Sequence, residues 1–201
     1  MAGGFDSRCR GPYHARAMAN PLRDHRTAAD WATVGQVIEI AEKLSCFERL
    51  ASVVGADLAA LESDMIPAHW RDSVIAGRLA FGFADEQQQL PMVRCEATVT
   101  TDAVCQRCLE AFRLPLEVEA SLLLLELGQT AEGYDHLEVW ELEEKDLRPQ
   151  DIVEELLIMA LPFSAMHVDS ASCKALYSEP RARVEKKKPF AAFRAQMSQE
   201  H

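Results

Sequence analysis

The longest alternating pattern in the chain is AFRLPLEVEASLLL, which occupies residues 111–124. Apolar side chains recur at every second position from Phe112 to Leu124, and charged side chains such as Arg113 and Glu117 lie between them. A period of two sustained over this length predicts a strand with one buried face in an antiparallel sheet. Pro115 has no N–H to donate to a neighbouring strand, so it indicates an edge position or a bulge.

Further strands are predicted on both sides of this segment. The same alternation of apolar and polar residues marks residues 34–40, 74–83, 91–100 and 136–142. The connections between these segments are short, and no strand–helix–strand alternation is visible, so we do not expect parallel pairing.

Helical spacing marks two other segments. Residues 43–54 are predicted to form a helix with Ser45 as its N-cap, because Glu48 follows three positions later. Residues 149–161 are predicted to form a second helix, which starts with a proline and stops before Pro162. The predicted fold class is therefore α+β: an antiparallel sheet, open or barrel-like, with a few packed helices and a hairpin that carries a CxxC motif.

Length and composition predict one soluble domain. The chain has 201 residues, 48 % of them hydrophobic, and a mean hydropathy of -0.13, which excludes a membrane-embedded bundle. We expect a disordered extension over 1–19, a single α+β domain over 20–180, and a basic linker with a short amphipathic helix over 181–201. The first residues lack the apolar segment of a secretory signal, so the six cysteines are interpreted as those of a reducing cytoplasm.

The net charge of -11 is distributed unevenly along the chain. Residues 1–30 carry five arginines against three aspartates, and residues 174–201 carry seven basic residues against three glutamates. Residues 31–173 therefore hold 9 basic and 26 acidic residues. An acidic body of this kind favours solubility or a basic protein partner, and it repels phosphate.

The motif with the most specific chemistry is Cys105-Gln-Arg-Cys108, which lies between two strand patterns and so at the tip of a hairpin. Two cysteines at this spacing can bind one zinc ion, and His167 and Cys173 are the candidates for the remaining two ligands. A redox pair would instead place the first cysteine at a helix N-terminus. A third alternative is a pair of turn thiols without a metal. Cys95 is expected to point into the core.

Other catalytic patterns are missing from the sequence. It has no glycine-rich phosphate loop, no HExxH and no Gly-x-Ser-x-Gly. The pairs Glu143-Glu144 and Glu154-Glu155 are interpreted as solvated surface. The residues alone thus predict a protein without enzymatic activity, in which Cys105 and Cys108 are either part of a metal-binding knuckle or turn thiols without a metal.

The order of several motifs resembles the YceD family of bacterial large ribosomal RNA subunit accumulation proteins. The motifs are the CxxC hairpin with its long strand, the acidic helix DIVEELL at 151–157, ALP at 160–162, then His167, Cys173 and KPFA at 188–191. The resemblance is best over residues 74–197. It implies a cytoplasmic protein that is needed for the synthesis, processing or stability of 23S rRNA, with no established catalytic activity.

The resemblance also bears on the site residues. Some relatives have more cysteines in the loop equivalent to 162–173, where this chain has one histidine and one cysteine. A Cys3His zinc site formed by Cys105, Cys108, His167 and Cys173 is the corresponding expectation.

Two routes to rRNA remain open at this point. In the first, basic residues near the C-terminus contact rRNA phosphates; these are Arg181, Arg183, Lys186, Lys187, Lys188 and Arg194. In the second, the acidic body binds a basic ribosomal or assembly protein. We favour the second route because so few cations rarely support specific binding of rRNA. No membrane partner is expected. Outside ribosome biogenesis, the alternatives are a CxxC thiol oxidoreductase and a zinc-stabilised adaptor for protein interactions unrelated to rRNA.

Overall fold

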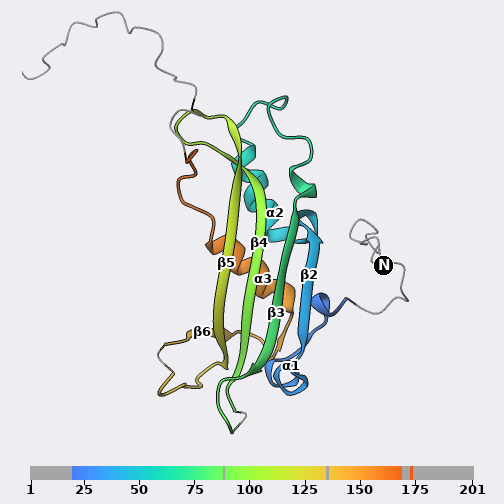
Figure 1. Cartoon of the computed structure of the whole chain (residues 1–201), viewed down its shortest axis with the longest axis vertical. Coiled ribbons are helices and arrows are strands. Elements are labelled where there is room, and N and C mark those ends of the chain that lie inside the picture. Colours follow the sequence, from blue (N-terminus) through green and yellow to red (C-terminus); the bar gives the residue numbers. More distant parts are fainter. Residues whose placement is uncertain (1–19, 88, 135, 169–172, 174–201) are drawn as a thin grey trace, which may run out of the picture.

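A five-stranded sheet with helices packed on one face forms the body of the molecule (Figure 1). The computed structural model describes residues 20–87, 89–134, 136–168 and 173. In spatial order the strands are β2 (Val37–Lys43), β3 (Val74–Phe83), β4 (Pro91–Val104), β5 (Ala111–Glu126) and β6 (Glu138–Leu142). A separate two-stranded pair joins β1 (Arg26–Thr27) and β7 (Asp146–Leu147).

The predicted α+β class is confirmed, and β3, β4 and β5 form antiparallel pairs as the alternation predicts. One expectation is wrong: β6 pairs with β5 in parallel, because the chain returns along the sheet between Glu126, where β5 ends, and Glu138, where β6 begins. Of the two alternatives for the sheet, open or barrel-like, the structure has the open one. Its edges are β2 and β6, which do not pair, and the helices bury its inner face in place of a closed barrel interior.

The inner face of the sheet and the helices share one apolar core. The helices are α1 (Ala28–Val34), α2 (Glu48–Leu58) and α3 (Pro149–Met159), with 3-10 turns η2 (Pro21–Arg23), η3 (Leu44–Cys46) and η4 (Trp70–Asp72). Within β4, Val93 and Cys95 are buried whereas Arg94 and Glu96 are exposed, so only one face of the sheet is packed. The fully buried Trp31 of α1 stacks on Phe81 of β3, with ring centroids 5.3 Å apart.

The N-terminus of α2 is capped from a distant part of the chain. The prediction of Ser45 as N-cap is wrong, because the helix starts at Glu48 and Phe47 occupies the cap position without a side-chain bond. Glu154 of α3 accepts a hydrogen bond of 2.9 Å from the Leu50 N–H. Glu154 is only 2 % exposed rather than solvated, and its side chain satisfies one of the backbone N–H groups that the first turn of a helix leaves without a partner.

A short helix, α1, precedes β2, and the alternating pattern of residues 34–40 did not indicate it. Val34 ends α1, and Gly35 closes this helix in the left-handed conformation with a φ of 59°. Thr27 caps its other end by accepting a hydrogen bond of 3.1 Å from the Asp30 N–H. The strand predicted over 34–40 therefore begins three residues later than expected.

The structure also tests the predicted position of Pro115 and the predicted end of the second helix. Pro115 lies in the part of β5 beyond the residues that pair with β6, in agreement with an edge position. The helix predicted over 149–161 ends at Met159. The extension over 1–19 and the linker and helix over 181–201 lie outside the described residues. Among the residues that the structure describes, no helix has both the length and the apolar character needed to cross a membrane.

Candidate metal centre

The β4–β5 hairpin places Cys105 and Cys108 at one end of the sheet (Figure 1). β4 ends at Val104, and the Cys105 N–H donates a 3.0 Å hydrogen bond to the carbonyl of Glu110 across the turn. The Leu109 N–H donates to the Cys105 carbonyl at 2.8 Å. Leu109 itself has a φ of 59°, a left-handed conformation that is uncommon for a branched residue and that the surrounding bonds hold in place.

The segment after α3 returns to this hairpin. α3 ends at Met159, and after Pro162 the chain runs alongside the turn, where the Gln106 N–H donates a 2.8 Å hydrogen bond to the Ala165 carbonyl. The imidazole of His167 packs on the ring of Phe112, with centroids 4.7 Å apart. These contacts bring residues that are far apart in sequence to the two cysteines.

The four predicted ligands lie together. The Sγ atoms of Cys105, Cys108 and Cys173 and the ring nitrogen of His167 all lie within 4.8 Å of one another. This is also the only group of three or more potential ligand side chains found among the described residues. Cys105 and Cys108 are buried, and the other two are partly exposed.

The distances in the cluster match a tetrahedral zinc site. With Zn–S bonds of about 2.3 Å and Zn–N bonds of about 2.0 Å, tetrahedral angles require about 3.8 Å between two sulfurs and about 3.5 Å between sulfur and nitrogen. The Cys105 and Cys173 Sγ atoms are 3.8 Å apart. His167 Nδ1 lies 3.6 Å from Cys108 Sγ and 3.4 Å from Cys173 Sγ. The donor set and these three distances are therefore compatible with one zinc ion.

The electrostatic surroundings differ among the thiols. Burial opposes ionisation of Cys105, but backbone N–H donors from Cys108, His167 and Arg107 outweigh it and lower its pKa to about 5. Burial and the neighbouring sulfurs raise the pKa of Cys173 to about 11. Cys95, buried in β4 with its pKa raised to about 12 mainly by burial, lies in the core as expected.

The remaining predicted site residues cannot be placed relative to this centre. The basic residues proposed for nucleic-acid contact, at 181–188 and 194, lie outside the described residues. The sequence did not predict the interactions that position the cluster, which are the Gln106–Ala165 hydrogen bond and the Phe112–His167 ring contact. Both depend on the tertiary path of the segment after α3, which no local sequence pattern specifies.

Comparison with known proteins supplies the family. Residues 93–195, just over half of the chain, match the model of the family described as large ribosomal RNA subunit accumulation protein YceD. The match begins in β4 and includes β5, β6, α3 and all four cluster residues. No curated protein and no solved structure shows a significant match to the chain. The chain belongs to the YceD family.

Proposed function

We propose that this protein supports the synthesis, processing or stability of 23S rRNA in the cytoplasm by contacting a basic ribosomal or assembly protein, without catalysing a reaction itself. The family's description connects it to the large ribosomal RNA subunit. The observation that carries the finer proposal is the charge of residues 31–173, with 26 acidic and 9 basic side chains. Such a surface attracts a basic protein and repels an RNA backbone.

The few cations of this body are mostly engaged with its own carboxylates. Five of the nine form ion pairs: Lys43 with Asp72, Arg49 with Glu155, Arg78 with Glu39, Arg113 with Asp102, and Arg148 with Asp151. Phosphate binding depends on cations that can replace the counterions of the nucleic acid. The described surface therefore offers little for direct rRNA binding and supports a protein-mediated route.

A salt titration of binding to large-subunit rRNA distinguishes this route from one through the C-terminal cations. We expect the full chain to bind no more tightly than about 10⁻⁶ M at physiological salt, in the range of non-specific contacts. A variant in which Arg181, Arg183, Lys186, Lys187, Lys188 and Arg194 are all replaced by glutamine should behave in the same way. Tight binding with a steep salt dependence, lost in this variant, would contradict the protein-mediated route.

We further propose that Cys105, Cys108, His167 and Cys173 hold one zinc ion. Four protein ligands complete a tetrahedral shell and leave no position for substrate or water, which is the arrangement of structural rather than catalytic zinc. Such an ion would join the segment after α3 to the β4–β5 hairpin. A thiol oxidoreductase would need an accessible attacking thiol, whereas Cys105 and Cys108 are both buried, so the geometry favours a metal.

A further inference from the structure

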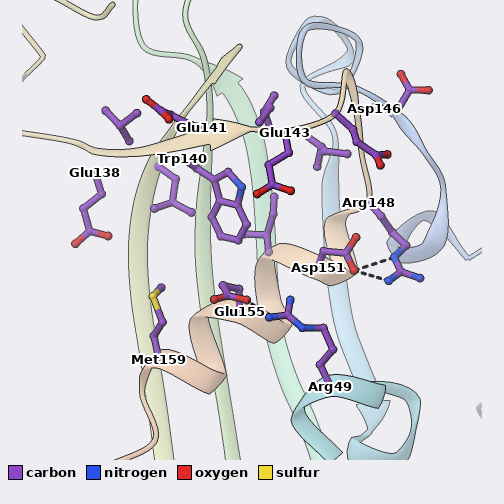
Figure 2. Close-up of a pocket in the computed structure, with 16 residues that line it drawn as sticks. Arg49, Glu138, Trp140, Glu141, Glu143, Asp146, Arg148, Asp151, Glu155 and Met159 are labelled. Carbon is purple, nitrogen blue, oxygen red and sulfur yellow. Dashed lines mark hydrogen bonds and ion pairs between the residues drawn. The ribbon is translucent and has the colours of Figure 1, made fainter. Parts of the chain in front are cut away.

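A groove opens between β6 and α3 (Figure 2). It lies at the opposite end of β5 from the β4–β5 hairpin that carries Cys105 and Cys108. Its volume is about 950 Å³, at the upper end of the usual range for ligand pockets. Apolar side chains contribute to its lining, and these are Leu122, Val139, Trp140, Leu142, Leu147, Ile152 and Met159. β6 is the last strand of the described sheet, so the groove lies along a sheet edge.

The polar side chains of the groove are almost all carboxylates. Seven acidic residues line it: Glu138, Glu141, Glu143, Glu144, Asp146, Asp151 and Glu155. The two lining arginines are each engaged, Arg49 with Glu155 and Arg148 with Asp151. The other five carboxylates form no ion pair with any described residue, although Lys145 lies between two of them in the sequence.

An aromatic ring stands among these carboxylates. Figure 2 shows Trp140 projecting from β6 toward α3, with Glu143 and Glu155 nearby. The ring is half-buried, so part of its surface is available to a ligand. An indole face attracts Lys and Arg cations, and apolar walls accept the methylene stems of these side chains.

The placement of the carboxylates in the groove favours a cationic peptide over a metal ion. A metal ion would need several carboxylates converging within a few ångströms, and the only convergent ligand group among the described residues is the cysteine cluster. The carboxylates are instead distributed over β6, the segment that follows it and α3. Nucleic acid is disfavoured because its phosphates would meet the same carboxylates.

We propose that the groove between β6 and α3 binds an extended Lys/Arg-rich segment of a partner protein, with one cationic side chain against Trp140. This inference rests on the proposed protein-mediated function and names the surface that would carry it. The partner's cations would pair with the five lining carboxylates that form no ion pair with a described residue, while their stems would cover the apolar lining.

The test is a titration of the full chain with a fluorescein-labelled dodecapeptide of alternating arginine and glycine, followed by fluorescence anisotropy at low salt. A Glu138→Lys, Glu143→Lys variant should bind at least about tenfold more weakly than wild type, because both reversed charges lie in the groove. The matched control is Glu117→Lys, Glu119→Lys, which changes net charge equally on exposed positions of β5 outside the groove. We expect the control to lose less than about threefold, since it contributes only through long-range charge.

A third variant separates specific recognition from general attraction. Trp140→Leu keeps an apolar side chain but removes the aromatic face, and it should weaken binding about threefold. Unchanged unfolding midpoints for all variants would show that the fold is retained. Equal losses in the groove and control variants, or an unaltered affinity for Trp140→Leu, would overturn the proposal.

The chain's own basic segment is the competing occupant. If the full chain does not bind the peptide but a Lys186→Gln, Lys187→Gln, Lys188→Gln variant does, the groove is covered from within and the partner assignment is wrong. The peptide titration contains no RNA, so its failure removes only the groove. Tight rRNA binding through the C-terminal cations would instead remove the protein-mediated route, whatever the peptide result.

Discussion

Chelation with EDTA at pH 7 is expected to lower the thermal unfolding midpoint of the zinc-loaded protein by roughly 12 °C. The ligands come from segments 68 residues apart in the chain, so only the folded state can assemble the full site. A metal present at a thousand times its dissociation constant stabilises the folded state by about 4 kcal/mol. Differential scanning calorimetry with and without EDTA measures this shift.

Two variants define the origin of the shift. A Cys105→Ser, Cys108→Ser variant should unfold at the same temperature with and without EDTA, because its site cannot be completed. Cys95→Ala removes a thiol outside the cluster and should keep the full response to EDTA, whatever its own midpoint. In the wild type, amide exchange at Gln106 should accelerate after chelation, because its bond to Ala165 links the hairpin to the returning segment. An unchanged wild-type midpoint in EDTA would contradict the role of the metal in stability.

Replacing Gly77 with alanine is expected to destabilise the fold by about 3 kcal/mol and lower the unfolding midpoint by roughly 9 °C. Gly77 lies in β3 opposite Ala97 of β4. A Cβ at this position would lie 2.2 Å from the Glu96 carbonyl oxygen and 2.8 Å from the Ala97 Cα. Both contacts are with backbone, so the two central strands would have to separate.

The same strand offers the control for this substitution. A Cβ at Gly82 would meet no atom within 4 Å, so Gly82→Ala should be neutral or slightly stabilising. Denaturant unfolding of both variants provides the comparison. Similar free energies of unfolding for Gly77→Ala and wild type would show that β3 and β4 are not packed as closely as described.

The parts of the fold that depend on local sequence could be predicted, and those that depend on distant contacts could not. The alternation in β3, β4 and β5 reports burial of one face directly, so these strands were predicted nearly to their ends. The cap of α2 is different, because the carboxylate that provides it belongs to Glu154, 104 positions away. The capping-box pattern indicated Ser45 because it depends only on residues that are close together in the sequence.

The direction of β6 and the groove beside it are also tertiary properties. A short strand such as Glu138–Leu142 has the same alternation whether it pairs in parallel or antiparallel. The sequence therefore could not predict its parallel pairing with β5. The acidic residues of this region could be recognised as charged, but not as the lining of one groove with Trp140 and α3.

The cysteine cluster was predictable in its membership because two kinds of sequence signal coincide. The CxxC spacing at a hairpin tip identifies one pair, and the helix stop at Pro162 places His167 and Cys173 in a loop that is free to return. The fit of the distances to one tetrahedral ion could come only from the folded chain.

X-ray absorption at the zinc edge of the purified full chain tests the metal centre most directly. We expect about one zinc per chain, with three sulfur ligands at about 2.3 Å and one nitrogen at about 2.0 Å, and no bound zinc in the Cys105→Ser, Cys108→Ser variant. A shell made only of oxygen and nitrogen, or less than about a tenth of an equivalent of zinc in protein purified without oxygen or chelators, would contradict the assignment of Cys105, Cys108, His167 and Cys173 as a zinc site.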